Sequence, residues 1–444
     1  MAHSLLCVGG LRSLIALLAA CTEASSPSPT TTHVVEAASF PATRVGALDL
    51  LFQVDDSGST AHLQSDLARA IPALFAALDG IELHVGVVTS DFGTAGGPPV
   101  GTVGQGGCAG YGQGGMLQTR GAPVDGPFVI DSPDTRNYTG ALGTVVGEML
   151  RVGSAGCGFE QPLAATRAAL RVNPGFLRPD ASLAIIMLAD EDDCSLSDPG
   201  LLTDDTLGPL QSFRCTRAGI VCDEPLDVLG EKHNCRPDTT SRYVEDPAVT
   251  LDMLLAIKPQ ERLTVSAIVG EPGPVAVGTI TLNGLPQLAL EPTCSWSLPT
   301  GPAVAHPPVR IASLVDGLAS RGVRGSVCHP DYAPALARIA LAIKRSLGIG
   351  CLDASQLADT LASPGLQPAC EVRDVSGTSQ TPLPRCPAMA DCYDIVEDTA
   401  TCGGNPRVVI DRKSPPAAGT RVDVYCEAPL PDAQRVQSLP LSSS

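Results

Sequence analysis

Apolar runs alternate with helical patterns between about residues 46 and 347. Continuous apolar runs, typical of strands buried on both faces, occupy residues 47–54, 83–88, 183–189 and 263–269. Helical periodicity is found over residues 63–78, 161–170, 249–257, 311–319 and 333–347. This alternation predicts one doubly wound α/β domain over residues 46–347, with a mostly parallel sheet covered by helices on both faces.

Three long insertions interrupt this pattern. Residues 93–115 are dense in glycine, residues 194–246 are rich in Asp, Pro and Cys, and residues 270–308 are rich in Pro and Gly. Within the last insertion, segments 279–282 and 287–290 flank Asn283-Gly284, which predicts a hairpin. Because long loops carry recognition more often than fold, we expect the insertions to determine partner choice.

The pattern changes after residue 348. Short strand-like runs such as 407–410 and 421–426 are separated by Pro, Gly and Cys. We therefore predict a small disulfide-rich β module over residues 348–430, followed by a polar tail over 431–444.

The N-terminus has the composition of an export signal. Arg12 precedes an apolar run over residues 14–20, which is too short to span a bilayer, and residues 1–20 are predicted to be a signal peptide. Leu18-Ala19-Ala20-Cys21 resembles the lipobox of bacterial lipoproteins, which implies that Cys21 is lipidated. The alternative is an ordinary cleavage site beside an unrelated cysteine.

Residues 21–45 are then predicted to be a flexible tether, because Ser, Pro and Thr dominate its beginning. We expect an exported protein whose lipid anchor is its only membrane contact. The expected location is the bacterial cell envelope, and there the outer membrane.

Cysteine number agrees with export. The chain has 16 cysteines; without Cys7 in the signal and Cys21 at the lipid site, 14 remain, an even number that allows seven disulfides. Disulfides persist in an exported protein, so pairing is favoured over metal binding, although the sequence does not fix which cysteines pair.

Composition and charge argue against a nucleic-acid-binding protein and against a disordered one. The net charge is −18, which disfavours binding to nucleic acid because phosphate backbones repel an acidic surface. Hydrophobic residues make up 44% of the chain, which is enough for a sizeable core and argues against wholesale disorder.

Candidate chemistry follows the first apolar run. Asp55, Ser57 and Ser59 form an Asp-x-Ser-x-Ser motif between the strand 47–54 and the next helix, and Asp190 follows the strand 183–189. Ligands bind at the carboxyl ends of parallel strands, and carboxylate and hydroxyl oxygens suit Mg²⁺. We predict a divalent-cation site there, the alternative being that Ser57 or Ser59 caps the helix.

The acidic run 190–193 has two further interpretations. A calcium loop is one, because adjacent carboxylates repel one another unless a cation lies among them. A solvated acidic loop is the favoured one.

Together these residues resemble the von Willebrand factor type A domain and its metal-ion-dependent adhesion site, over about residues 46–347. Asp55, Ser57 and Ser59 match the first motif of that family, and Asp190 matches its later Asp, although Glu191 stands where the family has Gly. The family's middle-loop Thr is missing from residues 156–160, where Glu160 is the candidate replacement ligand.

The resemblance implies an envelope-anchored adhesion protein rather than an enzyme. Its ion would be Mg²⁺ or Mn²⁺, with Ca²⁺ possible, and an open coordination position would accept a carboxylate from a protein or extracellular-matrix partner.

Two alternatives remain open. One is a metal-dependent hydrolase, for which the candidate general bases are Asp56, Asp91, Glu160 and Glu191. The other is a structural envelope scaffold whose metal site is empty.

Overall fold

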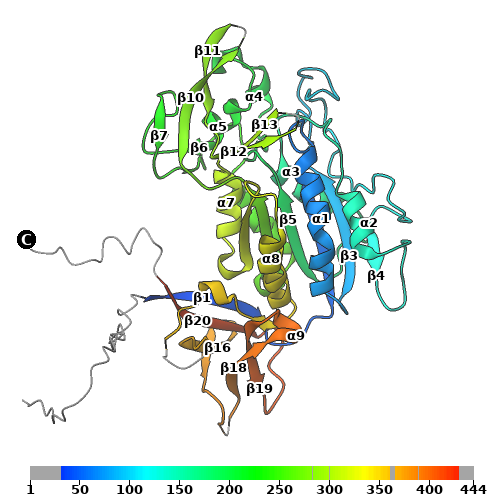
Figure 1. The fold of residues 1–444 in the computed structure, drawn as a ribbon, viewed down its shortest axis with the longest axis vertical. Coiled ribbons are helices and arrows are strands. Elements are labelled where there is room, and N and C mark those ends of the chain that lie inside the picture. The colour runs from blue at the N-terminus through cyan, green and yellow to red at the C-terminus, as the bar shows by residue number, and fades with distance from the viewer. Residues whose placement is uncertain (1–31, 283, 300, 361–365, 389, 430–444) are drawn as a thin grey trace, which may run out of the picture.

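A computed structural model describes residues 32–282, 284–299, 301–360, 366–388 and 390–429 (Figure 1). The α/β domain lies at the centre, the insertions extend from one end of its sheet, and the C-terminal β module lies at the opposite end. The predicted signal peptide, the lipidation site Cys21 and the predicted tail 431–444 lie outside the described residues.

The central sheet has six strands in the order β14-β9-β5-β2-β3-β4. The first five are parallel, and β4 pairs antiparallel with β3. The α/β class and the mostly parallel sheet are therefore confirmed. The strands are β2 (Ala47–Val54), β3 (Glu82–Thr89), β4 (Val129–Asp131), β5 (Ser182–Leu188), β9 (Leu263–Val269) and β14 (Gly322–Ser326).

Helices cover both faces of this sheet. On one face, Leu50 and Phe52 of β2 pack into a core shared with α1, α2 and α8, and on the other face Leu51 packs into a core shared with α3, α6 and α7. Burial on both sides explains why the strands are continuously apolar. The helices are α1 (Ala61–Ala77), α2 (Leu142–Met149), α3 (Pro162–Val172), α6 (Pro247–Ile257), α7 (Val309–Asp316) and α8 (Ala333–Ser346).

The insertions contain short elements joined by disulfides. The predicted hairpin is confirmed and longer than expected, and β7 pairs with its first strand. The strands are β6 (Ile220–Val221), β7 (Gly230–Lys232), β8 (Arg236–Pro237), β10 (Val275–Leu282), β11 (Leu285–Leu290), β12 (Cys294–Leu298) and β13 (Gly301–Ala305). The helices are α4 (Gly200–Thr203) and α5 (Phe213–Gly219), and the four 3₁₀ turns of the described chain are Asp205–Leu207, Gln260–Arg262, Ala319–Arg321 and Ala354–Gln356. Two disulfides lie within the second insertion, Cys194–Cys215 and Cys222–Cys235, and two others, Cys108–Cys157 and Cys294–Cys328, tie the first and third insertions to the rest of the domain.

The C-terminal module consists of two antiparallel sheets, as a disulfide-rich β module should. One has the order β1-β20-β16-β17 and the other the order β15-β19-β18. The elements are β1 (Thr32–Pro41), β15 (Gly350–Cys351), β16 (Cys370–Ser376), β17 (Ser379–Leu383), β18 (Cys392–Asp398), α9 (Thr399–Cys402), β19 (Asn405–Asp411) and β20 (Arg421–Pro429). Its disulfides are Cys351–Cys402, Cys370–Cys426 and Cys386–Cys392, so the structure contains all seven bonds that 14 cysteines allow.

One predicted boundary is wrong. The tether expected over residues 21–45 contains strand β1, which pairs along its length with β20 at the far end of the sequence. Ala38 and Phe40 of β1 lie in the apolar core of the module. The module is therefore built from both ends of the described chain, and the α/β domain is inserted between them.

Because β1 pairs with β20, a substitution in β1 should lower the free energy of unfolding. The buried Ser39 hydroxyl donates to Asp423 Oδ1 at 2.8 Å, so Ser39→Ala leaves a buried carboxylate oxygen with one donor fewer. We expect a loss of about 1–2 kcal/mol in the free energy of unfolding, measured by urea denaturation. Thr43→Ala, which removes an exposed hydroxyl just after β1, is the control and should be neutral. Equal stability of both variants would argue against β1.

Within the described ranges, no helix is both long enough and apolar enough to cross a membrane.

Candidate metal centre

Asp55 lies at the carboxyl end of β2, in the turn before α1. The Ser57 backbone N–H donates to its Oδ1 at 2.8 Å. The Thr60 hydroxyl and the Gln64 amide both donate to the Asp55 backbone carbonyl, at 2.8 Å each. Because these contacts fix the turn, the direction of the Asp55 carboxylate is set by the backbone and does not depend on a salt bridge.

Ser57 and Ser59 present two neighbouring hydroxyls in the same turn. Their Oγ atoms are 3.2 Å apart, with Ser57 buried and Ser59 exposed. The capping alternative is wrong, because the N-cap residue of α1 is Thr60 and no side chain caps the helix. Both hydroxyls are therefore available for another role.

Asp190 reaches the same place from the neighbouring strand. Strands β5 and β2 pair in parallel, and the Asp55 backbone N–H donates to the Leu188 carbonyl at 2.9 Å. Asp55 is fully buried and Asp190 is 3% exposed. In the described part of the chain, Asp55 Oδ2 and Asp190 Oδ1 are buried without any hydrogen-bond partner. Two adjacent carboxylates with unsatisfied oxygens are unfavourable unless a cation lies between them.

The pKa values of Asp55 and Asp190 reflect the same lack of positive charge around the two carboxyl groups. Burial first, and then the negative charge of Asp190, raise the pKa of Asp55 well above its usual value. Burial and the charge of Glu191 raise the pKa of Asp190 to about 7, while Ser59 and Asp55 act in the opposite direction. Since no cation of the described chain appears among these influences, an added divalent ion would stabilise both charged forms.

Glu160 lies close to both aspartates, just before α3. It is 4% exposed, and its pKa is raised by burial, then by the charge of Glu191, then by that of Asp55. Its strongest electrostatic neighbour is therefore Glu191 rather than either aspartate. The structure brings Glu160 to the site, and its predicted role as a metal ligand stays a prediction.

The donor set fits a small hard cation. Asp55, Ser57, Ser59 and Asp190 offer carboxylate and hydroxyl oxygens, which Mg²⁺ and Mn²⁺ prefer. Among the described residues, no three His, Cys, Asp or Glu side chains are arranged to hold a metal ion together. An ion at this centre would therefore depend on the two serines and on water for much of its coordination.

Ser90 is a member of the centre that the sequence analysis missed. Its hydroxyl lies 3.3 Å from Asp55 Oδ1 and 3.3 Å from Asp56 Oδ1. Ser90 directly follows β3, the strand beside β2, so its position at the same sheet edge was a usable signal. Burial and the charge of Asp91, followed by that of Asp55, raise the pKa of Asp56 to about 7.

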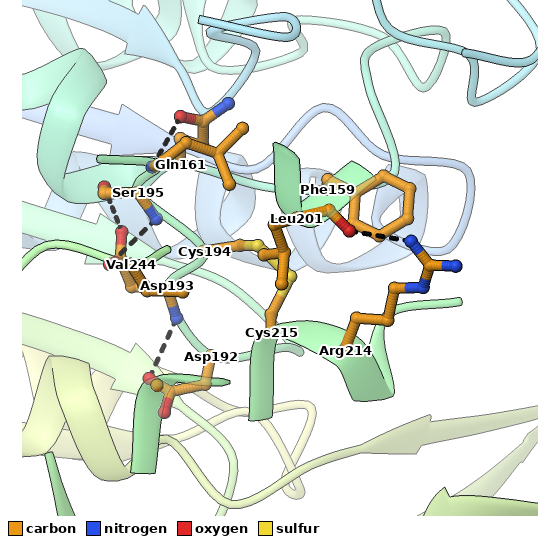
Figure 2. Close-up of a disulfide and its surroundings, with 12 residues drawn as sticks. Phe159, Gln161, Asp192, Asp193, Cys194, Ser195, Leu201, Arg214, Cys215 and Val244 are labelled. Atoms are coloured by element: carbon orange, nitrogen blue, oxygen red, sulfur yellow. Dashed lines mark hydrogen bonds between the residues drawn. A yellow bond between two sulfur atoms is a disulfide. The ribbon is translucent and has the colours of Figure 1, made fainter. Parts of the chain in front are cut away.

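The acidic run 190–193 is not a solvated loop, contrary to expectation. Asp193 is buried and forms an ion pair with the buried Arg310 at 2.9 Å, and Asp192 accepts hydrogen bonds from the backbone N–H groups of Arg310 and Ile311. Figure 2 shows Asp192 and Asp193 beside the Cys194–Cys215 disulfide, with Asp193 accepting a hydrogen bond from the Ser195 hydroxyl. Arg310 could not be assigned from the sequence because it comes from a distant segment.

The comparisons with known proteins do not assign the chain to a family. It matches no model of a protein family and no curated protein. Among solved structures, it is similar to the conserved hypothetical protein BatB from Bacteroides thetaiotaomicron, with 12% identity and a TM-score of 0.29 over 68% of this chain and 100% of BatB.

It is also similar to two pilus adhesins. For SpaC from Lactobacillus rhamnosus GG the identity is 10% and the TM-score 0.31, over 88% of this chain and 40% of SpaC. For RrgA from Streptococcus pneumoniae the identity is 9% and the TM-score 0.30, over 90% of this chain and 58% of RrgA. The chain thus spans less than two thirds of either adhesin. At these scores the similarities identify neither a family nor a function.

Proposed function

We propose that the chain is a non-catalytic binding protein of the von Willebrand type A kind, which uses a divalent ion at the β2–β5 edge to bind a carboxylate of a partner. The observation that carries this proposal is the pair of buried carboxylate oxygens, Asp55 Oδ2 and Asp190 Oδ1, which have no partner in the described chain. Such oxygens are what a cation requires and what a structural role does not explain.

Four residues of the chain would hold the ion, and they would have two different roles. Asp55 and Asp190 would supply the negative charge, and Ser57 and Ser59 would complete one side of the coordination with hydroxyl oxygens. A Mg²⁺ or Mn²⁺ ion held in this way supplies a Lewis-acid position that a partner's Asp or Glu can occupy. The insertions after β5 and β9 leave the sheet at the same end, so they would form the surface around that position (Figure 1).

The cellular setting belongs to the same proposal. An exported, lipid-anchored protein would present this centre at the cell envelope to a protein or matrix partner. The disulfides support export, because disulfides form and persist mainly in oxidising compartments outside the cytoplasm.

Calorimetric titration tests the ion. Mg²⁺, Mn²⁺ and Ca²⁺ are titrated separately into the disulfide-bonded chain after treatment with a chelator. We expect saturable binding of one Mg²⁺ or Mn²⁺ per chain. A folded protein that shows no saturable heat with any of the three ions would overturn the proposal.

A second experiment tests whether a carboxylate can occupy the open coordination position of the ion. With Mn²⁺ bound, the relaxation rate of water protons reports exchangeable water at the ion. Addition of N-acetyl-glutamate amide should lower this rate, because its carboxylate displaces water, whereas N-acetyl-glutamine amide should leave it unchanged. Equal behaviour of the two probes would contradict carboxylate recognition.

Acid should weaken metal binding. Protons and the cation compete for the same carboxylate oxygens, and the pKa of Asp190 is about 7 without metal while that of Asp55 is raised well above its usual value. Affinity for Mg²⁺ should therefore fall by about tenfold or more per pH unit below pH 7. Titrations between about pH 6 and about pH 8 would measure this, and a constant affinity would contradict the assignment of these carboxylates.

A further inference from the structure

A cavity of about 210 Å³ lies beside the metal centre, between the segment after β5, helix α5 and the β10–β11 hairpin. We call it the acidic cavity, and the residues that define it are Glu160, Glu191, Ser212, Phe213, Ile280 and Leu290. Ile280 is 46% exposed, so the cavity opens to the surface at the hairpin. Gln211, also in its lining, donates to the Leu288 carbonyl at 2.8 Å, which ties α5 to the hairpin.

One end of the acidic cavity carries two carboxyl groups without a cation. Glu160 is more than nine-tenths buried, and its carboxyl group lines the cavity together with that of Glu191. The one arginine in the lining, Arg310, already donates to Asp193 and to the Gly219 carbonyl.

A metal at the neighbouring centre would not remove this imbalance. In the coordination proposed above, through Asp55, Ser57, Ser59 and Asp190, a divalent ion balances the charges of the two aspartates and adds no partner for Glu160 and Glu191. A second metal ion between the glutamates is disfavoured, because no three acidic or imidazole groups in the described residues converge to hold one.

The rest of the cavity is apolar, which favours a different cation. Phe213 and Ala289 are buried in its wall, and Ile280 and Leu290 lie nearer the hairpin. His306 also lines it, and burial lowers its pKa, so its neutral ring can accept a hydrogen bond. An ammonium head has three donors for acidic and imidazole acceptors, and an aliphatic stem would cover the apolar wall.

We propose that the acidic cavity binds an alkylammonium group, a primary amine on an aliphatic stem, carried either by a lysine side chain or by a free amine. This goes beyond the metal centre and does not depend on it, since it rests on Glu160, Glu191 and the apolar wall. If a partner supplies the lysine, that partner would be recognised at two adjacent points.

The test is carried out on the full disulfide-bonded chain in the presence of a chelator. Two probes, n-butylamine and Nα-acetyl-lysine amide, are titrated and compared with the Nε-acetylated form of the second, which has the same stem without the charge. We expect saturable binding of an amine and none of the acetylated control. Glu191→Gln should weaken amine binding by about tenfold or more, because it removes a charge-assisted hydrogen bond.

Two further variants keep the test specific. Glu231→Gln changes an exposed glutamate on β7, away from the cavity lining, and should bind the amine normally. Ala289→Phe fills the cavity and should abolish binding while the protein remains folded by circular dichroism.

Binding of Nα-acetyl-lysine amide, with or without n-butylamine, identifies a lysine side chain as a fitting ligand, and binding of n-butylamine alone identifies a free amine. Absence of binding, equal binding of the acetylated control, or an unchanged affinity in Glu191→Gln would overturn the proposal. Because metal is absent throughout, failure here leaves the Mg²⁺ titration unaffected, and failure of that titration leaves amine binding intact.

Discussion

Replacing Asp55 by alanine should abolish binding of Mg²⁺ and Mn²⁺, and Asp190→Ala should do the same. Each change removes one of the two carboxylates at the centre, and the serine hydroxyls that remain carry no charge to hold a divalent ion. We expect at least about a hundredfold loss of affinity, since loss of a charged ligand costs more than a neutral hydrogen bond. Calorimetric titration at pH 8 measures it.

The same variants separate a binding role from a structural one. In the metal-free protein, burial and the charge of Asp190 raise the pKa of Asp55, and burial and the charge of Glu191 raise that of Asp190, so both charged forms are disfavoured in the fold. Asp55→Asn, which keeps the shape and removes the charge, should therefore raise the Tm of the metal-free protein at pH 8 while metal binding is lost. A lower Tm would indicate that Asp55 serves the fold and would contradict the proposed centre.

Asp66→Asn is a suitable control. Asp66 lies on α1, within the same part of the sequence, but its carboxylate pairs with the exposed Arg69 and takes no part in the centre. Its metal affinity and Tm should stay close to those of the unaltered chain, because exposed ion pairs contribute little.

The residues of the candidate metal centre could be placed together from the sequence because the signals that position them are local. Asp55 and Asp190 each follow a strand that is apolar on both faces, and such strands pair in parallel with their carboxyl ends together. The same argument could have placed Ser90 at the centre, because Ser90 directly follows the neighbouring strand β3. The sequence thus contained the centre's carboxylates and hydroxyls, though not their burial.

Helix α2 shows where local signals fail. It contains Gly143 and Gly147, which are poor helix formers. A methyl group on Gly143 would lie 2.8 Å from the Pro72 Cα, and one on Gly147 would lie 3.2 Å from the Ala68 carbonyl oxygen. The glycines therefore permit close packing against α1, a tertiary reason that overrides propensity.

Strand β1 and the disulfide connectivity were not predictable for a related reason. The partner of β1 is β20, at the opposite end of the described sequence, and nothing in residues 32–41 alone specifies it. The ion pair of Asp193 with Arg310 likewise joins the segment after β5 to the start of α7. Contacts over such separations are set by the assembled fold.

Arg310→Met should destabilise the protein by about 3–5 kcal/mol, because it leaves Asp193 as a buried, unpaired charge. Arg310 is 1% exposed, and its guanidinium also donates to the carbonyls of Asp193, Gly219 and Glu245. These contacts join three segments: the one after β5, the end of α5 and the one before α6. The free energy of unfolding from guanidinium chloride titration measures the loss.

Two comparisons show whether the cost comes from the unpaired charge. Arg69→Met removes the exposed partner of Asp66 and should cost at most about 1 kcal/mol. Asp193→Asn added to Arg310→Met should recover part of the stability, because it removes the buried negative charge, although Asp193 also accepts from Ser195 and from the backbone at Leu163. A double variant no more stable than Arg310→Met would assign the loss to the carbonyl contacts of Arg310. If Arg310→Met itself cost no more than Arg69→Met, the buried ion pair would not be what holds these three segments together.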